Sequence, residues 1–243
     1  MNDYRKFGLL RCIAESTKLQ LGILWLLTEA DTRPDGEFRS YLQDASRWQH
    51  HDPTLFSSLI QLLSPDTARN VDHTGAWGLL PGASYFNQIV SDSALQRQRF
   101  MALAFQELAH CPLLFLDPDN GVEVRSIRYG AKGSCKFVFW RELAALFQRG
   151  HSLIIYQHYP RIPRPLFERQ LIQAFREKVG APEVTVFATA HVAFVVALQE
   201  AHAHFLPVIR ESIHTRWAGQ IRETNCVEPP PLDGHPTADG LSS

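Results

Sequence analysis

Apolar positions along this chain follow two different patterns. Residues 4–15 place Phe7, Leu10 and Ile13 at helical spacing and predict an opening amphipathic helix. Nearly uninterrupted apolar runs instead predict strands that are buried on both faces, as in a parallel sheet. We expect such strands, all in one sheet, near residues 20–28, 112–116, 152–157, 184–190 and 192–198.

Helices are predicted between these strands. Asp52 is a good N-cap and Pro53 suits the first helical position, so a helix should begin there. Further helical segments are expected over residues 91–108, 140–149, 165–179 and about 200–213. The alternation predicts a Rossmann-like α/β fold: a mostly parallel sheet with helices on both faces and a closing antiparallel strand.

The length of 243 residues suits a single α/β domain with a sizeable core, which we expect over residues 1–226. Residues 227–243 carry four prolines, three acids and few large aliphatic side chains. Such a segment buries too little apolar surface to offset its ordering entropy. We therefore expect a disordered C-terminal tail there.

The chain has 24 Lys and Arg against 25 Asp and Glu, a formal net charge of −1. This balance excludes nucleic-acid binding by bulk positive charge alone, although it allows a local basic groove. No apolar run approaches the roughly 18 residues of a membrane span, and the first residues lack the apolar core of a signal peptide. The widely spaced Cys12, Cys111, Cys135 and Cys226 indicate reduced thiols and a cytoplasmic location.

The densest polar cluster, Asp117-Pro118-Asp119-Asn120-Gly121, follows the strand predicted at residues 112–116. It suits a tight turn, but Asp117 and Asp119 also suit a site for a divalent cation or an amine. His158 follows the next predicted strand, either as a structural hydrogen-bonding residue or as a catalyst. Because the carboxyl ends of parallel strands converge, we expect Asp117, Asp119, Asn120 and His158 to line one pocket.

Basic and aromatic residues are interleaved after this turn, namely Arg125, Arg128, Lys132 and Lys136 with Tyr129, Phe137, Phe139 and Trp140. They suit either a surface that follows a phosphate backbone or a solvated loop before a helix. The histidines at positions 50, 51, 202 and 204 lack good metal-ligand spacing, and we expect them to be solvated. P-loop, dinucleotide-binding, α/β-hydrolase and zincin motifs are absent from the sequence.

Two short stretches resemble a known family. Asn2-Asp3-Tyr4-Arg5-Lys6-Phe7, with Asp and Lys three residues apart before a hydrophobic helix, is similar to the N-terminal segment of bacterial large-subunit ribosomal RNA adenine-N6 methyltransferases. Asp117-Pro118-Asp119-Asn120 stands where that family has Asp-Pro-Pro-Tyr. By pattern, the similarity to the Rossmann-like methyltransferase order covers most of residues 1–200.

The resemblance implies a methyltransferase-like enzyme that uses S-adenosylmethionine and acts on the amino group of a base, with RNA or DNA as partner and no membrane. It assigns Asp117 and Asn120 to catalysis, and we add His158 because it directly follows a predicted strand. Asp3, Lys6, Asp35 and Gly36 would hold the cofactor. The cofactor loop is degenerate, because Gly36 is the one glycine that follows the first strand before the next helix.

Two other functions stay open. In a Mg²⁺-dependent phosphoesterase or nuclease, Asp117, Asp119 and Glu123 would bind the metal, and Lys136 or His158 would assist the attacking water. A non-catalytic binding protein derived from the same fold would instead bind a partner with the surface that forms the cofactor pocket in the enzymes. In either enzyme, Asp117→Asn should abolish activity while the fold persists.

Overall fold

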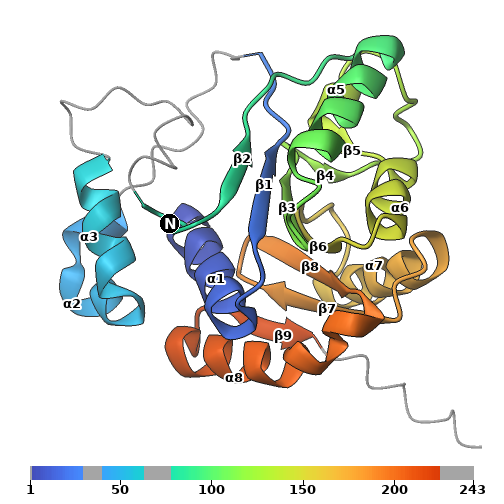
Figure 1. The fold of residues 1–243 in the computed structure, drawn as a ribbon. Helices are drawn as coiled ribbons and strands as arrows, with labels where there is room; N and C mark the ends of the chain where they lie inside the picture. Colours follow the sequence, from blue (N-terminus) through green and yellow to red (C-terminus); the bar gives the residue numbers. More distant parts are fainter. Residues whose placement is uncertain (1, 30–39, 63–77, 225–243) are drawn as a thin grey trace, which may run out of the picture.

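The computed structural model describes residues 2–29, 40–62 and 78–224. Within these ranges a seven-stranded sheet forms the centre, in the order β2-β1-β3-β6-β8-β7-β9 (Figure 1). Its strands are β1 (Leu21–Trp25), β2 (Ser84–Phe86), β3 (Leu113–Asp117), β6 (Ser152–His158), β7 (Glu183–Ala188), β8 (Val192–Leu198) and β9 (Arg222–Thr224). A separate two-stranded sheet pairs β4 (Gly121–Val122) with β5 (Phe137–Val138).

Strand direction confirms the predicted Rossmann-like α/β fold. β2, β1, β3 and β6 are parallel neighbours. β8 is antiparallel to both β6 and β7, so β7 runs in the same direction as β6. β9 closes the far edge antiparallel to β7. The strands predicted at residues 112–116 and 152–157 are direct partners, with Leu113 opposite Ser152.

Helices cover both faces of the sheet. α5, α6 and α7 lie on one face, and α1 and α8 lie on the other (Figure 1). The helices are α1 (Asn2–Thr17), α2 (Ala45–Trp48), α3 (Pro53–Leu62), α5 (Ala94–Glu107), α6 (Trp140–Gln148), α7 (Arg164–Lys178) and α8 (Leu206–Trp217). Short 3₁₀ segments are η1 (Ser40–Gln43), η2 (Gln49–His51), η3 (Ser134–Lys136) and η4 (Glu200–Phe205).

Alternate side chains of the central strands enter two different cores. In β3, Phe115 packs on the α1 and α8 side, while Leu116 packs on the side of α5, α6 and α7. Both faces of the strand are therefore apolar, as its sequence predicts. Close contact between α1 and α8 requires Gly8, because a Cβ there would lie 1.9 Å from an atom of the Trp217 ring.

Most predicted elements are present with shifted ends. The first strand is limited to β1, and the last predicted helix is divided into η4 and the longer α8. β2, β4, β5 and β9 have two or three residues each, which is too short for a periodic signal. Asp35, Gly36 and the predicted tail at residues 227–243 lie outside the described residues. No helix in the described ranges is both long and apolar enough to cross a membrane.

Asp52 confirms its predicted role as an N-cap and also joins three helices. Its Oδ1 accepts a hydrogen bond from the Leu55 backbone N–H at 3.0 Å. Its Oδ2 lies 3.0 Å from the Arg11 guanidinium of α1 and 2.9 Å from that of Arg216 in α8. One buried carboxylate thus fixes the start of α3 against both helices of this face.

The expectation of solvated histidines is wrong for His51 and His202. His51 is buried, its ring stacks on Trp217 at 5.0 Å, and its Nδ1 donates to the Arg216 carbonyl at 2.7 Å. His202 is half-buried and its Nδ1 lies 2.8 Å from the Ser152 hydroxyl. His50 and His204 are exposed, as predicted.

The guanidinium of Arg97, a fully buried residue of α5, holds the segment between β4 and α6 in place. It contacts both carboxylate oxygens of Glu142 at 2.7 and 2.9 Å. It also donates to the backbone carbonyls of Ser134 and Phe137 at 3.0 and 2.6 Å. Two helices and the connecting chain are therefore fixed by one buried cation.

We expect Arg97→Met to lower the free energy of unfolding by about 3–5 kcal/mol, because it leaves the buried Glu142 carboxylate without its counter-charge. Urea unfolding followed by circular dichroism measures this change. Arg99→Met, on the exposed side of the same helix, is the matched control and should change stability by at most about 0.5 kcal/mol. Equal effects of the two substitutions would contradict the role of the ion pair.

Candidate functional site

Lys6 and Asp117 meet where β1 and β3 end. Asp117 is the last residue of β3 and lies opposite Trp25, the last residue of β1. Lys6, near the start of α1, places its Nζ 2.9 Å from Asp117 Oδ2 and 3.3 Å from Asp3 Oδ1. The structure therefore brings together three of the residues that the sequence assigns to the site.

Three aromatic rings surround the Lys6 ammonium. Its Nζ lies 5.4 Å from the ring centroid of Phe7, 5.1 Å from that of Trp25 and 5.6 Å from that of Tyr156. The electron-rich faces of aromatic rings attract cations at such distances. The side chains of Lys6 and Asp117 are 11% and 16% exposed. The result is a mostly buried cation between carboxylates and rings.

Burial and charge act differently on the two partners. Burial alone would lower the pKa of Lys6, but the carboxylates of Asp117 and Asp3 outweigh it and raise this pKa above its ordinary value. Burial raises the pKa of Asp117, and the single Lys6 ammonium offsets this effect in part, while Asp3 adds to it. Lys6 therefore stays protonated, and the carboxyl of Asp117 takes up a proton more readily than an exposed aspartate.

The acidic turn, residues 117–121, lies at the end of β3 and is held by hydrogen bonds on several sides. Asp119 accepts from the Thr28 hydroxyl at 2.8 Å, which joins the turn to the chain that follows β1. The Asn120 backbone N–H donates to the Lys136 carbonyl at 2.8 Å. The interpretation as a structured turn is thus supported for Asp119 and Asn120, while Asp117 points to Lys6.

The three carboxylates proposed for a metal site have separate partners. Asp117 pairs with Lys6, Asp119 accepts from Thr28, and Glu123 accepts the Trp140 backbone N–H at 2.8 Å at the start of α6. Among the residues that the structure describes, no group of three His, Cys, Asp or Glu side chains could hold a metal ion.

Gln157 fastens the acidic turn to β6, a role that the sequence analysis did not assign. Its Oε1 accepts the Val122 N–H at 2.8 Å, and its Nε2 donates to the His158 carbonyl at 2.7 Å. Gly121, with φ of +100°, allows this contact because a Cβ there would lie 2.4 Å from Gln157 Oε1. The amide side chain at the end of an otherwise apolar run is the sequence signal that could have identified it.

His158 lies at the exposed end of β6. Its ring contacts Tyr156 edge-on, with centroids 5.1 Å apart, and its charge acts to lower the pKa of Asp117. His158 is therefore near the Lys6–Asp117 pair and linked to it through Tyr156. That it shares one pocket with Asp119 and Asn120 stays a prediction.

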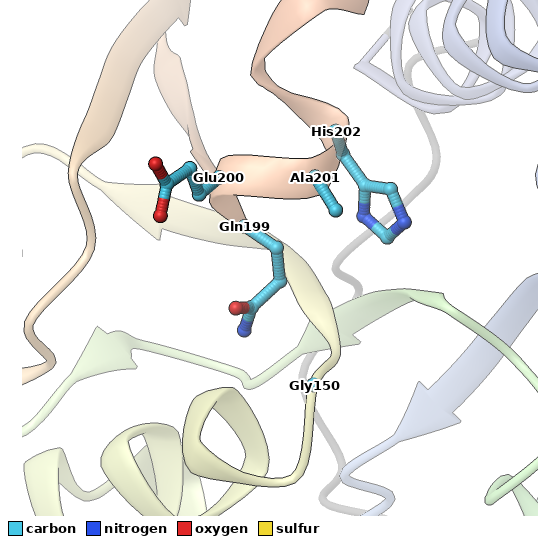
Figure 2. A pocket seen from close by; sticks show the side chains of 5 residues that line it. All are labelled: Gly150, Gln199, Glu200, Ala201 and His202. Carbon is cyan, nitrogen blue, oxygen red and sulfur yellow. The ribbon is translucent and has the colours of Figure 1, made fainter.

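Two cavities lie at the opposite end of the sheet. One is lined by Gly150, Gln199, Glu200, Ala201 and His202 (Figure 2). The other lies beside the end of α1 and the start of β1. Gly150 precedes β6 and Gln199 follows the antiparallel β8, so the cavity of Figure 2 is far from the strand ends that carry Asp117. Neither cavity includes a residue that the sequence assigns to catalysis.

The Trp25 indole is a further polar group beside Lys6. Trp25 is 4% exposed, and its Nε1 is buried and has no hydrogen-bond partner in the described part of the chain. An unsatisfied buried donor costs about 1–3 kcal/mol, so this indole calls for a partner. Asp3, Lys6, Trp25 and Asp117 are the polar groups that could contact a ligand at this end of β1 and β3.

No protein-family description, curated protein or solved structure matches this chain.

We expect Lys6→Met to raise the pKa of Asp117 further above its ordinary value, because burial remains while the neighbouring positive charge is lost. Proteins labelled with ¹³C at the aspartate carboxyl would show this by NMR titration, with Asp117→Asn used to assign the resonance. Lys18→Met, at an exposed residue directly after the same helix, is the control and should leave the midpoint unchanged. An unchanged midpoint in Lys6→Met would contradict the pairing of Lys6 with Asp117.

Proposed function

We propose that this chain is a methyltransferase-like enzyme that uses S-adenosylmethionine to methylate the amino group of a base in nucleic acid. The observation that carries the proposal is Asp117, a carboxylate at the carboxyl end of a central parallel strand with an amine nitrogen already 2.9 Å from its Oδ2. Ligands of open α/β sheets bind at this end of the strands. The carboxylate is therefore suited to orient an amino group.

The charges beside Asp117 fit the cofactor. With both carboxylates ionised, Asp3, Asp117 and Lys6 carry one net negative charge, which suits the positive sulfonium centre. The rings of Phe7, Trp25 and Tyr156, which already surround one cation, suit a second cationic group. Asp35 and Gly36 were assigned to the same cofactor from the sequence, but they lie outside the described residues.

The bound cofactor would supply an electrophilic methyl group. Lys6 holds Oδ2 of Asp117 at 2.9 Å, and we assign Oδ1 to the target amine. Oδ1 would then accept an N–H of the target amine and direct its lone pair toward the methyl group. Transfer of that methyl group to the amine would form the C–N bond, with Asp3 and Lys6 beside the cofactor. The amine then gives up one proton, and His158, near Asp117 and exposed, can pass it to solvent.

The two carboxylates of the acidic turn distinguish methyl transfer from metal catalysis. Methyl transfer needs the carboxylate of Asp117, but it does not need that of Asp119, which accepts a hydrogen bond from Thr28. A Mg²⁺ site built from Asp117, Asp119 and Glu123 would need both aspartates. Comparison of the two asparagine variants therefore separates the functions.

We expect Asp117→Asn to reduce methyl transfer from labelled S-adenosylmethionine to an RNA or DNA mixture by roughly 100-fold or more, because the neutral amide orients the amine poorly. Asp119→Asn is the matched control and should retain most of the activity. Since Lys6 keeps Asp3 as a partner, we expect Asp117→Asn to lower the free energy of unfolding by about 1–3 kcal/mol. A thermal melt checks that the variant is folded.

Calorimetry of the wild type with S-adenosylmethionine and, separately, with Mg²⁺ completes the test. Binding of the cofactor supports the proposed enzyme. Binding of Mg²⁺ that is lost in both asparagine variants would favour the phosphoesterase. If neither ligand binds and no transfer occurs, the proposal is wrong and a non-catalytic binding role is favoured.

A further inference from the structure

Two segments beside the candidate site contain bases and no acids. Residues 124–136 include Arg125, Arg128 and Lys132, and residues 156–167 include Arg161 and Arg164. These five side chains and Arg141, at the start of α6, are exposed. We call these six residues the basic rim. None of them has a carboxylate partner among the residues that the structure describes.

The two segments leave the sheet at neighbouring points. The Gln157 side chain of β6 accepts the backbone N–H of Val122 in β4 at 2.8 Å. The first segment begins one residue beyond β4, after Glu123, and the second includes the end of β6. Both therefore start beside the acidic turn that carries Asp117, although they are separate in the sequence.

Carboxylates near the first segment point into its backbone. Asp92 accepts the N–H groups of Gly133 and Cys135, both at 2.7 Å. These hydrogen bonds outweigh burial and keep the pKa of Asp92 below its ordinary value. Glu123 accepts the Trp140 N–H in the same way at 2.8 Å. The acids thus stabilise the loop, while the bases face solvent.

Two guanidinium groups of the rim rest on aromatic rings. The Cζ of Arg141 lies 3.0 Å from the Tyr129 ring centroid, and that of Arg164 lies 5.1 Å from the Tyr159 ring centroid. Stacking leaves the N–H groups at the edge of a guanidinium free to bind oxygen atoms. It also reduces the conformational entropy that is lost on binding. These two cations are therefore pre-organised for phosphate oxygens.

We propose that the basic rim binds the phosphate backbone of an unpaired nucleic-acid strand that passes over the acidic turn. Arginine contacts to phosphates supply affinity without sequence preference. The strand is unpaired because the Asp117 side chain is only 16% exposed, so a base amino group within a stacked duplex cannot reach it. The unpaired state of the strand rests on the proposed function, whereas phosphate binding by the basic rim requires neither cofactor nor methyl transfer.

Fluorescence anisotropy with a labelled single-stranded RNA of about 20 nucleotides, without cofactor, tests the rim. Arg161→Gln/Arg164→Gln and Arg125→Gln/Arg128→Gln each remove two charges from one segment. The matched control, Lys18→Gln/Arg149→Gln, removes two exposed charges at the amino ends of β1 and β6. All these side chains are exposed, so each variant should melt near the wild-type temperature.

We expect each rim variant to weaken binding by roughly fivefold or more at about 100 mM salt, and the control by less than about twofold. Each rim variant should also flatten the slope of log Kd against log salt concentration by about 1.4, since two phosphate contacts to a single strand are lost. A duplex of the same sequence should bind more weakly than the single strand.

Four results would overturn the inference. The first is no binding by the wild type at about 50 mM salt, and the second is equal weakening by rim and control variants. The third is duplex binding as tight as single-strand binding. If the rim variants instead lose binding to phosphatidylserine vesicles and keep RNA binding, the partner is an anionic membrane surface and the inference is wrong. The anisotropy assay contains no cofactor. If RNA binds there but the separate assay shows no methyl transfer, the proposed function is wrong and the inference about the basic rim still holds.

Discussion

A buried ammonium requires a counter-charge, and Lys6 obtains it from Asp117 across the boundary between α1 and the sheet. Desolvation of an unpaired ion costs several kcal/mol, so α1 is stable in this position only where a carboxylate meets it. That requirement places the first turn of α1 above the end of β3, while Gly8 allows the rest of α1 to approach α8. The contact that positions α1 therefore also positions the carboxylate on which the proposed chemistry depends.

Other buried charges position elements in the same manner. Arg97 joins α5 to α6 through Glu142, and the buried Glu168 of α7 binds Arg222 and Thr224 of β9. Burial would raise the pKa of Glu168, but its hydrogen bonds with these residues and with the Tyr159 hydroxyl lower it, so the carboxylate stays charged. Apolar side chains fill both cores without specifying how each helix docks. The directional ion pairs supply that specificity, since a shifted helix would leave a buried charge unpaired.

The sequence predicted the parts of the fold that local pattern determines. Strands such as β3 and β6 are apolar on both faces, and this signal is readable from five to seven residues. The meeting of Lys6 with Asp117 was expected only through a family resemblance, because no local pattern links residues so far apart. Arg97 gave no signal at all, since its partners lie beyond the next strand. His51 was expected to be solvated because it stands in a polar loop, but its burial depends on Trp217 of α8.

Net charge is the coarsest of these sequence measures, because it does not say where in the structure each charge is held. A chain with a formal charge of −1 has no bulk attraction for a polyanion. The carboxylates of Asp92 and Glu123 accept hydrogen bonds from backbone N–H groups, so their charges lie inside the loop. The six residues of the basic rim are exposed and have no carboxylate partner in the described part of the chain. At a Debye length of about 10 Å, a phosphate group experiences the nearest exposed charges rather than the sum over the chain. Binding of a polyanion is therefore decided by where each charge is held.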